Sequence, residues 1–99
     1  MAKIYDLEMT VPLGIRHGTM VLKENADGNV DGTIEILGNE TPFTGKLDGI
    51  HLSMEGTLKT QIRNVSYQGQ GTLEGERIEM KIKDNQNIYR LSGKERKER

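Results

Sequence analysis

The chain contains no cysteine and no tryptophan, and it has one phenylalanine and two prolines among its 99 residues. Without cysteine it has no disulfide bond, no thiolate metal ligand and no thiol nucleophile. No apolar run approaches the length of a membrane-spanning helix, and residues 1–6 lack the apolar segment of a secretory signal. We therefore expect a cytoplasmic protein that does not associate with membranes.

The charges are balanced, with 14 Lys and Arg, 15 Asp and Glu, and a net charge of −1. They are interspersed along the chain rather than gathered in one region, whereas nucleic-acid-binding proteins typically carry a basic patch. We therefore expect no nucleic-acid partner and no basic or acidic face. The length predicts one domain, which we assign to residues 1–95, followed by a charged, disordered tail at 96–99.

The clearest structural signal is an Asp-Gly pair at residues 48–49, which lies between two runs of alternating apolar and polar residues. Asp-Gly favours a two-residue type I′ loop, and this combination is the strongest short hairpin signal. With that loop, Leu47 is expected opposite Ile50, and Phe43 opposite Met54. One face of the hairpin is then apolar and the other polar.

The same alternation recurs along the rest of the chain, and no helix of useful length competes with it. The expected strands cover residues 3–11, 16–24, 29–37, 40–47, 50–60, 65–73 and 76–83, with a last strand after a turn at 84–87. The turns predict these further pairs: Leu7 with Met20, Met20 with Ile34, Ile34 with Phe43, Leu58 with Tyr67, and Ile82 with Tyr89.

All the turns place apolar side chains on the same face of the sheet, and no helix is available to cover that face. Closure of the sheet hides the apolar face and removes the open edges together. We therefore predict an all-β fold, an antiparallel meander of about eight strands closed into a small up-and-down β-barrel. The alternative is an open, curled sheet that pairs face to face with a second copy.

Several glycines fall on the inward face, and they have two interpretations. Glycine allows a strongly coiled strand to bend where a side chain would crowd its neighbours. Alternatively, Gly32 opposite Gly45 and Gly56 opposite Gly69 leave room for a ligand beside the barrel wall. A barrel of about eight strands is either filled by its own side chains or holds one small ligand, so both interpretations stay open.

The inward face contains no carboxylate, histidine, lysine or arginine, so no titratable group is placed for general acid–base catalysis. His17 and His51 fall on the outer face, and neither has a second ligand at metal-binding spacing. We therefore predict a non-enzymatic protein with no catalytic residues, no metal site and no cofactor.

If the interior binds a ligand, methionine would adapt to its apolar parts and tyrosine would orient its polar end. The candidate ligand-binding residues are Tyr5, Met20, Phe43, Met54, Tyr67, Met80 and Tyr89. The alternative role of these side chains is to fill the core.

A meander of short strands joined by tight turns over residues 3–95 resembles the calycin-type barrels of lipocalins, fatty-acid-binding proteins and streptavidin. Lipocalins have a Gly-x-Trp near the first strand, and streptavidin-like proteins use several tryptophans to hold biotin. This chain has no tryptophan, so no binding residue is transferred from either family. The resemblance implies the barrel architecture and an interior suited to a small apolar molecule.

Two functions follow from these observations. The first is a non-enzymatic binding protein that holds a small apolar ligand in the barrel, and the alternative is a protein-interaction or homo-oligomeric assembly module with a packed core. Apolar residues left outside the core or at strand ends favour a homodimer. These residues are Ile4, Val21, Leu37, Ile62 and Ile88.

Overall fold

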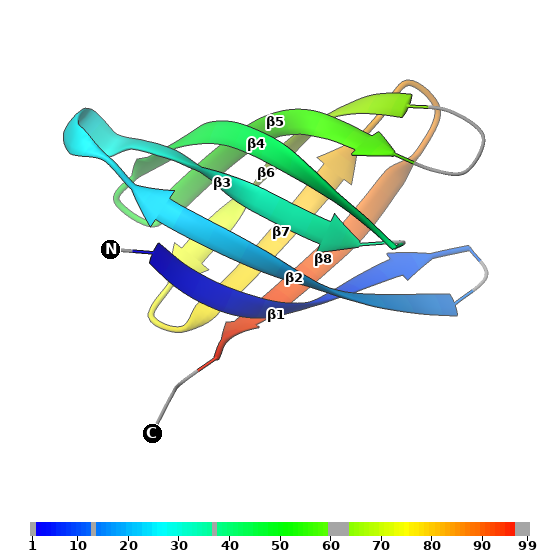
Figure 1. Cartoon of the computed structure of the whole chain (residues 1–99), viewed down its shortest axis with the longest axis horizontal. Helices are drawn as coiled ribbons and strands as arrows, with labels where there is room; N and C mark the ends of the chain where they lie inside the picture. Colours follow the sequence, from blue (N-terminus) through cyan, green and yellow to red (C-terminus); the bar gives the residue numbers. More distant parts are fainter. Residues whose placement is uncertain (1, 13, 37, 60–63, 97–99) are drawn as a thin grey trace.

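The structure is a computed structural model in which residues 2–12, 14–36, 38–59 and 64–96 are described. Its strands are β1 (Ala2–Val11), β2 (Gly14–Glu24), β3 (Asn29–Ile36), β4 (Asn39–Asp48), β5 (His51–Lys59), β6 (Asn64–Glu74), β7 (Arg77–Lys83) and β8 (Ile88–Glu95). Each strand pairs antiparallel with the next, and β8 pairs with β1, so the sheet closes into a barrel (Figure 1). The predicted up-and-down barrel is confirmed, and the open sheet is wrong. No helix within the described residues is long and apolar enough to cross a membrane.

The barrel is flattened, with extents of 35, 30 and 18 Å along its principal axes. Viewed down the shortest axis, β2, β3 and β4 lie in front and β6, β7 and β8 lie behind (Figure 1). We define the front wall as the outward-facing side chains of residues 2–10, 17–23, 29–35 and 40–42. The back wall comprises the outward-facing side chains of residues 64–74, 77–83 and 88–94.

Buried apolar side chains from all eight strands fill the space between the walls. They occupy alternate positions, as the sequence pattern predicts, because successive side chains of a strand point to opposite faces. Val11, Leu47, Leu58 and Tyr89 are partly buried and pack against this core. The core therefore extends over most of the length of the barrel.

The turn between β4 and β5 is displaced by one residue from its predicted position. Asp48 pairs with His51, so the two-residue loop consists of Gly49 and Ile50. Gly49 adopts a φ of +63°, a conformation that glycine tolerates best. Ile50 was expected to face inward opposite Leu47, but it lies in the turn and is 43% exposed.

Two hairpins have the predicted register, with Met20 opposite Ile34 and Ile82 opposite Tyr89. Four others are shifted by two residues. Their observed pairs include Tyr5 with Met20, Leu7 with Gly18, Ile34 with Thr41, Phe43 with Gly56, and Gly56 with Tyr67. A shift of two residues keeps every side chain on its original face, so the hydrophobic pattern alone does not detect it.

The observed registers place each inward glycine within the strands between two large side chains on the neighbouring strands. Gly32, for example, lies between Leu22 and Phe43. The same arrangement holds for Gly18, Gly45, Gly56, Gly69, Gly71 and Gly93. We call these seven residues the interlocked glycines. The expected glycine pairs at 32 with 45 and 56 with 69 do not occur, so they provide no room for a ligand.

The space beside the interlocked glycines is occupied. A Cβ atom at Gly71 would lie 1.9 Å from the backbone oxygen of Glu79, so the neighbouring strand itself fills this position. At Gly69 a Cβ atom would lie 2.7 Å from Cδ1 of Ile82, so here a side chain fills it. These glycines therefore permit the close approach of strands in a strongly coiled sheet.

The end of β8 is attached to β1. The backbone N–H of Arg96 donates to the carbonyl oxygen of Ile4 at 2.7 Å, and the Arg96 guanidinium forms an ion pair with Asp6. Residues 97–99 of the expected tail lie outside the described residues.

Candidate functional site

The predicted ligand-binding residues all face the interior of the barrel. Six of them are at most 4% exposed, namely Tyr5, Met20, Phe43, Met54, Tyr67 and Met80. Tyr89 is half-buried and packs against the edge of the core. The pairing brings Tyr5 beside Met20 and places Phe43 and Tyr67 on either side of Gly56. These residues thus form part of the general core, spread over several strands.

The candidate residues fill the gaps that the glycines leave. A Cβ atom at Gly56 would lie 3.0 Å from the hydroxyl oxygen of Tyr67, so the phenol group covers this glycine. At Gly69 a Cβ atom would meet Cε of Met80 at 3.0 Å and Cγ of Met54 at 3.3 Å. Their packing is therefore that of core residues, which is the second of the two roles considered for them.

Three buried hydroxyl groups have no hydrogen-bond partner among the described residues, namely those of Tyr5, Thr41 and Tyr67. Burial raises the pKa of Tyr67 to about 12. Burial also raises the pKa of Tyr5, and the nearby carboxylates of Glu95 and Glu24 raise it further. Both phenols are therefore protonated at neutral pH. An unpaired buried hydroxyl of this kind lowers the free energy of unfolding by about 1–3 kcal/mol.

The two histidines lie on the outer face, as predicted. His17 is opposite Glu8 and His51 is opposite Asp48, and both imidazoles are exposed. Throughout residues 2–12, 14–36, 38–59 and 64–96, no three His, Asp or Glu side chains are close enough together to hold a metal ion.

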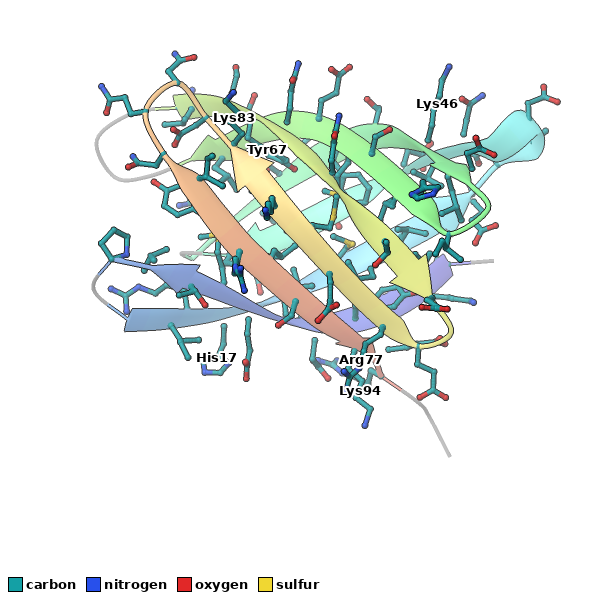
Figure 2. All side chains as sticks on the ribbon, turned by 180° about the vertical axis from the view of Figure 1, so that it is seen from behind. His17, Lys46, Tyr67, Arg77, Lys83 and Lys94 are labelled. Atoms are coloured by element: carbon teal, nitrogen blue, oxygen red, sulfur yellow. The ribbon has the colours of Figure 1, made fainter. Side chains whose placement is uncertain are left out.

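A hollow of about 970 Å³ lies on the outside of the barrel, over the strands from β4 to the start of β8. Its polar lining includes Lys46, Ser53, Gln70, Lys81 and Lys83. Figure 2, which views the barrel from behind, shows Lys83, Arg77 and Lys94 distributed over the back wall. The sequence gives no signal for this surface, because its lining comes from five strands that only the closed barrel brings together.

Charges of opposite sign are separated between the two walls. The described carboxylates of the front wall are Asp6, Glu8, Asp31, Glu35 and Glu40, with Lys23 as its one lysine. The cations of the back wall are Arg77, Lys81, Lys83, Arg90 and Lys94, and its described carboxylates are Glu74 and Glu79. The expectation that charge is not gathered on a face is therefore wrong. Acidic residues are concentrated in the early strands and basic residues in the late ones, and the closed barrel turns these strands to opposite sides.

Like charges lie directly opposite each other on both walls. Lys81 is paired with Arg90 on the back wall, and Glu35 is paired with Glu40 on the front wall. No described carboxylate lies within ion-pair distance of Lys81 or Arg90. Directly opposed like charges destabilise a sheet, so both pairs would be stabilised by a partner of opposite charge.

Comparison with protein-family models finds no match to this chain, and comparisons with curated proteins and with solved structures find none either.

Proposed function

We propose that this protein is a non-enzymatic interaction or assembly module of the cytoplasm, in which the barrel interior serves as core and the outer walls make the contacts. The observation that carries this proposal is the arrangement of the interlocked glycines. Each lies between large side chains, and strand backbone or side-chain atoms occupy the adjoining space. Such close packing favours a barrel filled by its own residues over one that holds a ligand.

The surface supports the same proposal. The described parts of the front and back walls carry charges of opposite sign, and a hollow lies over the back wall and the strands beside it. Complementary charge gives an interface its specificity and raises the rate of encounter.

Native mass spectrometry of the freshly purified protein tests the filled interior. We expect the bare mass of the chain or its multiples, and no stoichiometric small molecule after denaturation and extraction. Titration with cis-parinaric acid, a fluorescent fatty acid, should give no saturable binding, with a fatty-acid-binding protein as the positive control. A stoichiometric apolar adduct, or saturable uptake of the fatty acid, would overturn the proposal.

A second candidate function is the binding of a small apolar molecule inside a calycin-like barrel. It is favoured by the hydroxyl groups of Tyr5 and Tyr67, which are buried without a protein partner and would orient the polar end of such a molecule. On this alternative, Tyr67→Phe would weaken fatty-acid uptake while leaving the barrel folded. Equal uptake by both proteins would count against a role for Tyr67 in binding.

A further inference from the structure

We propose that the front wall of one copy binds the back wall of another, so that the chain assembles front to back through opposite charges. This inference rests on the proposed function as an interaction module, and it names the partner as a second copy of the same chain.

The front wall combines a weakly polar centre with acidic flanks. Ile4 lies opposite Val21, and the row continues across Thr33 to Pro42. The side chains of Ile4 and Val21 are half-buried although they point outward. An apolar centre with a charged rim is the usual composition of a protein interface.

Carboxylates lie on both sides of this central row. The opposed pair of Glu35 and Glu40 lies in the row on one side, together with Asp6, which is paired with Arg96. In the row on the other side, Asp31 lies opposite Lys23. The unpaired negative charge of the front wall is therefore concentrated at Glu35 and Glu40, at positions that are fixed by the strand register.

The back wall presents the complementary charge. Lys81 lies between Gln70 and Arg90, and Lys83 lies opposite Gln68 in the adjacent row. On β6, β7 and β8 these two rows contain cations, neutral amides and the apolar Ile88, with no described carboxylate. Contact with the front wall of another copy would relieve the repulsion within both like-charged pairs.

Size and charge both favour a second copy as the occupant. The broad faces of the barrel measure 35 by 30 Å, which accommodates the roughly 800 Å² per partner of a standard interface. Front-to-front or back-to-back pairing would oppose like charges, whereas front-to-back pairing opposes unlike ones. Contacts between two different faces generate rings or open stacks rather than simple dimers.

The apolar residues that favoured a homodimer lie in different places. Ile4 and Val21 are in the front wall, and Ile88 is 65% exposed on the back wall. Leu37 and Ile62 lie outside the described residues.

Exchange of the charges on one wall at a time tests the inference. In one variant, Lys81→Glu and Arg90→Glu make the opposed pair of the back wall acidic, and in the other, Glu35→Lys and Glu40→Lys make the opposed pair of the front wall basic. By analytical ultracentrifugation at low salt, we expect the wild type to grow in mass with concentration. Each variant alone should associate at least about tenfold more weakly, because its reversed pair then meets a pair of the same charge on the other wall.

An equimolar mixture of the two variants should restore the assembly, because each opposed pair of one variant then meets a pair of opposite charge on the other. The control variant carries Lys3→Glu and Arg16→Glu, exposed positions at the two ends of the barrel, where the same change in charge should leave assembly intact. At about 1 M salt, where the Debye length is about 3 Å, the wild-type assembly should dissociate. Circular dichroism verifies that every variant is folded.

A wild type that stays monomeric at low salt, or folded variants that fail to complement each other, would overturn the inference. Binding of poly-glutamate or of a DNA oligonucleotide by a monomeric wild type, lost with Lys81→Glu and Arg90→Glu, would assign the back wall to another anionic partner. Such results leave the interaction module standing, whereas uptake of an apolar ligand overturns the proposed function itself, so the two failures are distinguishable.

Discussion

Substitution of two neighbouring glycines of β6 by alanine tests the close packing of the barrel directly. Gly69 and Gly71 face the same side of the same strand, and neither has a positive φ, so alanine is compatible with the backbone at both positions. They differ in what a new methyl group would meet. At Gly71 it would meet the backbone oxygen of Glu79 at 1.9 Å and Cα of Met80 at 2.6 Å. At Gly69 it would meet the flexible ends of the Ile82 and Met80 side chains at 2.7 and 3.0 Å, and Cγ of Met54 at 3.3 Å.

The two substitutions should therefore have different costs. Overpacking typically costs about 1–3 kcal/mol, and Gly71→Ala belongs at or above the upper end because a strand backbone cannot rotate out of the way. Gly69→Ala should fall within about 1 kcal/mol of the wild type, because side-chain ends can move and alanine lowers the entropy of the unfolded chain by about 0.4–1 kcal/mol.

Urea denaturation of the two variants and the wild type gives the free energies of unfolding, and equal m-values make them comparable. A loss of about 3 kcal/mol in a domain of this size corresponds to a fall in Tm of at least about 12 °C. Equal stabilities for Gly69→Ala and Gly71→Ala would refute the assignment of Gly71 to a close contact between strands. A stable Gly71→Ala that gains fatty-acid binding would show that the interior is not filled.

Three further substitutions address the core, a buried hydroxyl and the attachment of β8. Met54→Ala should lower the free energy of unfolding by about 2–5 kcal/mol and leave fatty-acid titrations flat, so a small loss of stability would indicate loose packing around Met54. Tyr67→Phe should stabilise the protein by about 1–3 kcal/mol, because it removes a buried hydroxyl that has no partner. The pKa of about 12 for Tyr67 lies above the unfolded value of 10.0, so stability should fall from pH 10 upward as the unfolded state loses this proton. Tyr67→Phe should reduce that fall in urea titrations, and an unchanged slope would contradict the assignment. The hydrogen bond from Arg96 lowers the pKa of the Asp6 carboxyl, so NMR titration of Arg96→Ala should show this pKa raised toward its ordinary value. An unchanged pKa would mean that the ion pair does not persist in solution.

The sequence was sufficient to predict which side of each strand faces the core, and hence the closed barrel. Apolar side chains recur with a period of two, and this signal is independent of the partner strand. Register was less accessible, since a shift of two residues preserves the pattern. The pairing of Phe43 with Gly56 and of Gly56 with Tyr67 shows the missing signal, which is that a glycine lies opposite a large side chain.

The candidate site was predictable only in part. The direction of Tyr5, Met54 and Tyr67 followed from the period of two, but whether they line a cavity depends on packing in three dimensions. The separation of charge was missed for a related reason. Lys81 and Arg90 are nine positions apart in a chain of mixed charge, and only the register of β7 with β8 places them side by side.

The pairing of β8 with β1 differs from all the others in the barrel because it joins strands from the two ends of the chain, with Tyr5 opposite Glu95. Every other pairing joins strands that follow each other in sequence, and such local hairpins form quickly because their loops are short. We therefore expect closure by β1 and β8 to be the slow step of folding. A circular permutant that is opened in the turn at Gly49 and linked across the original ends would convert this pairing into a local hairpin and leave β4 and β5 to close the barrel, so the last pairing to form should change from β1 with β8 to β4 with β5.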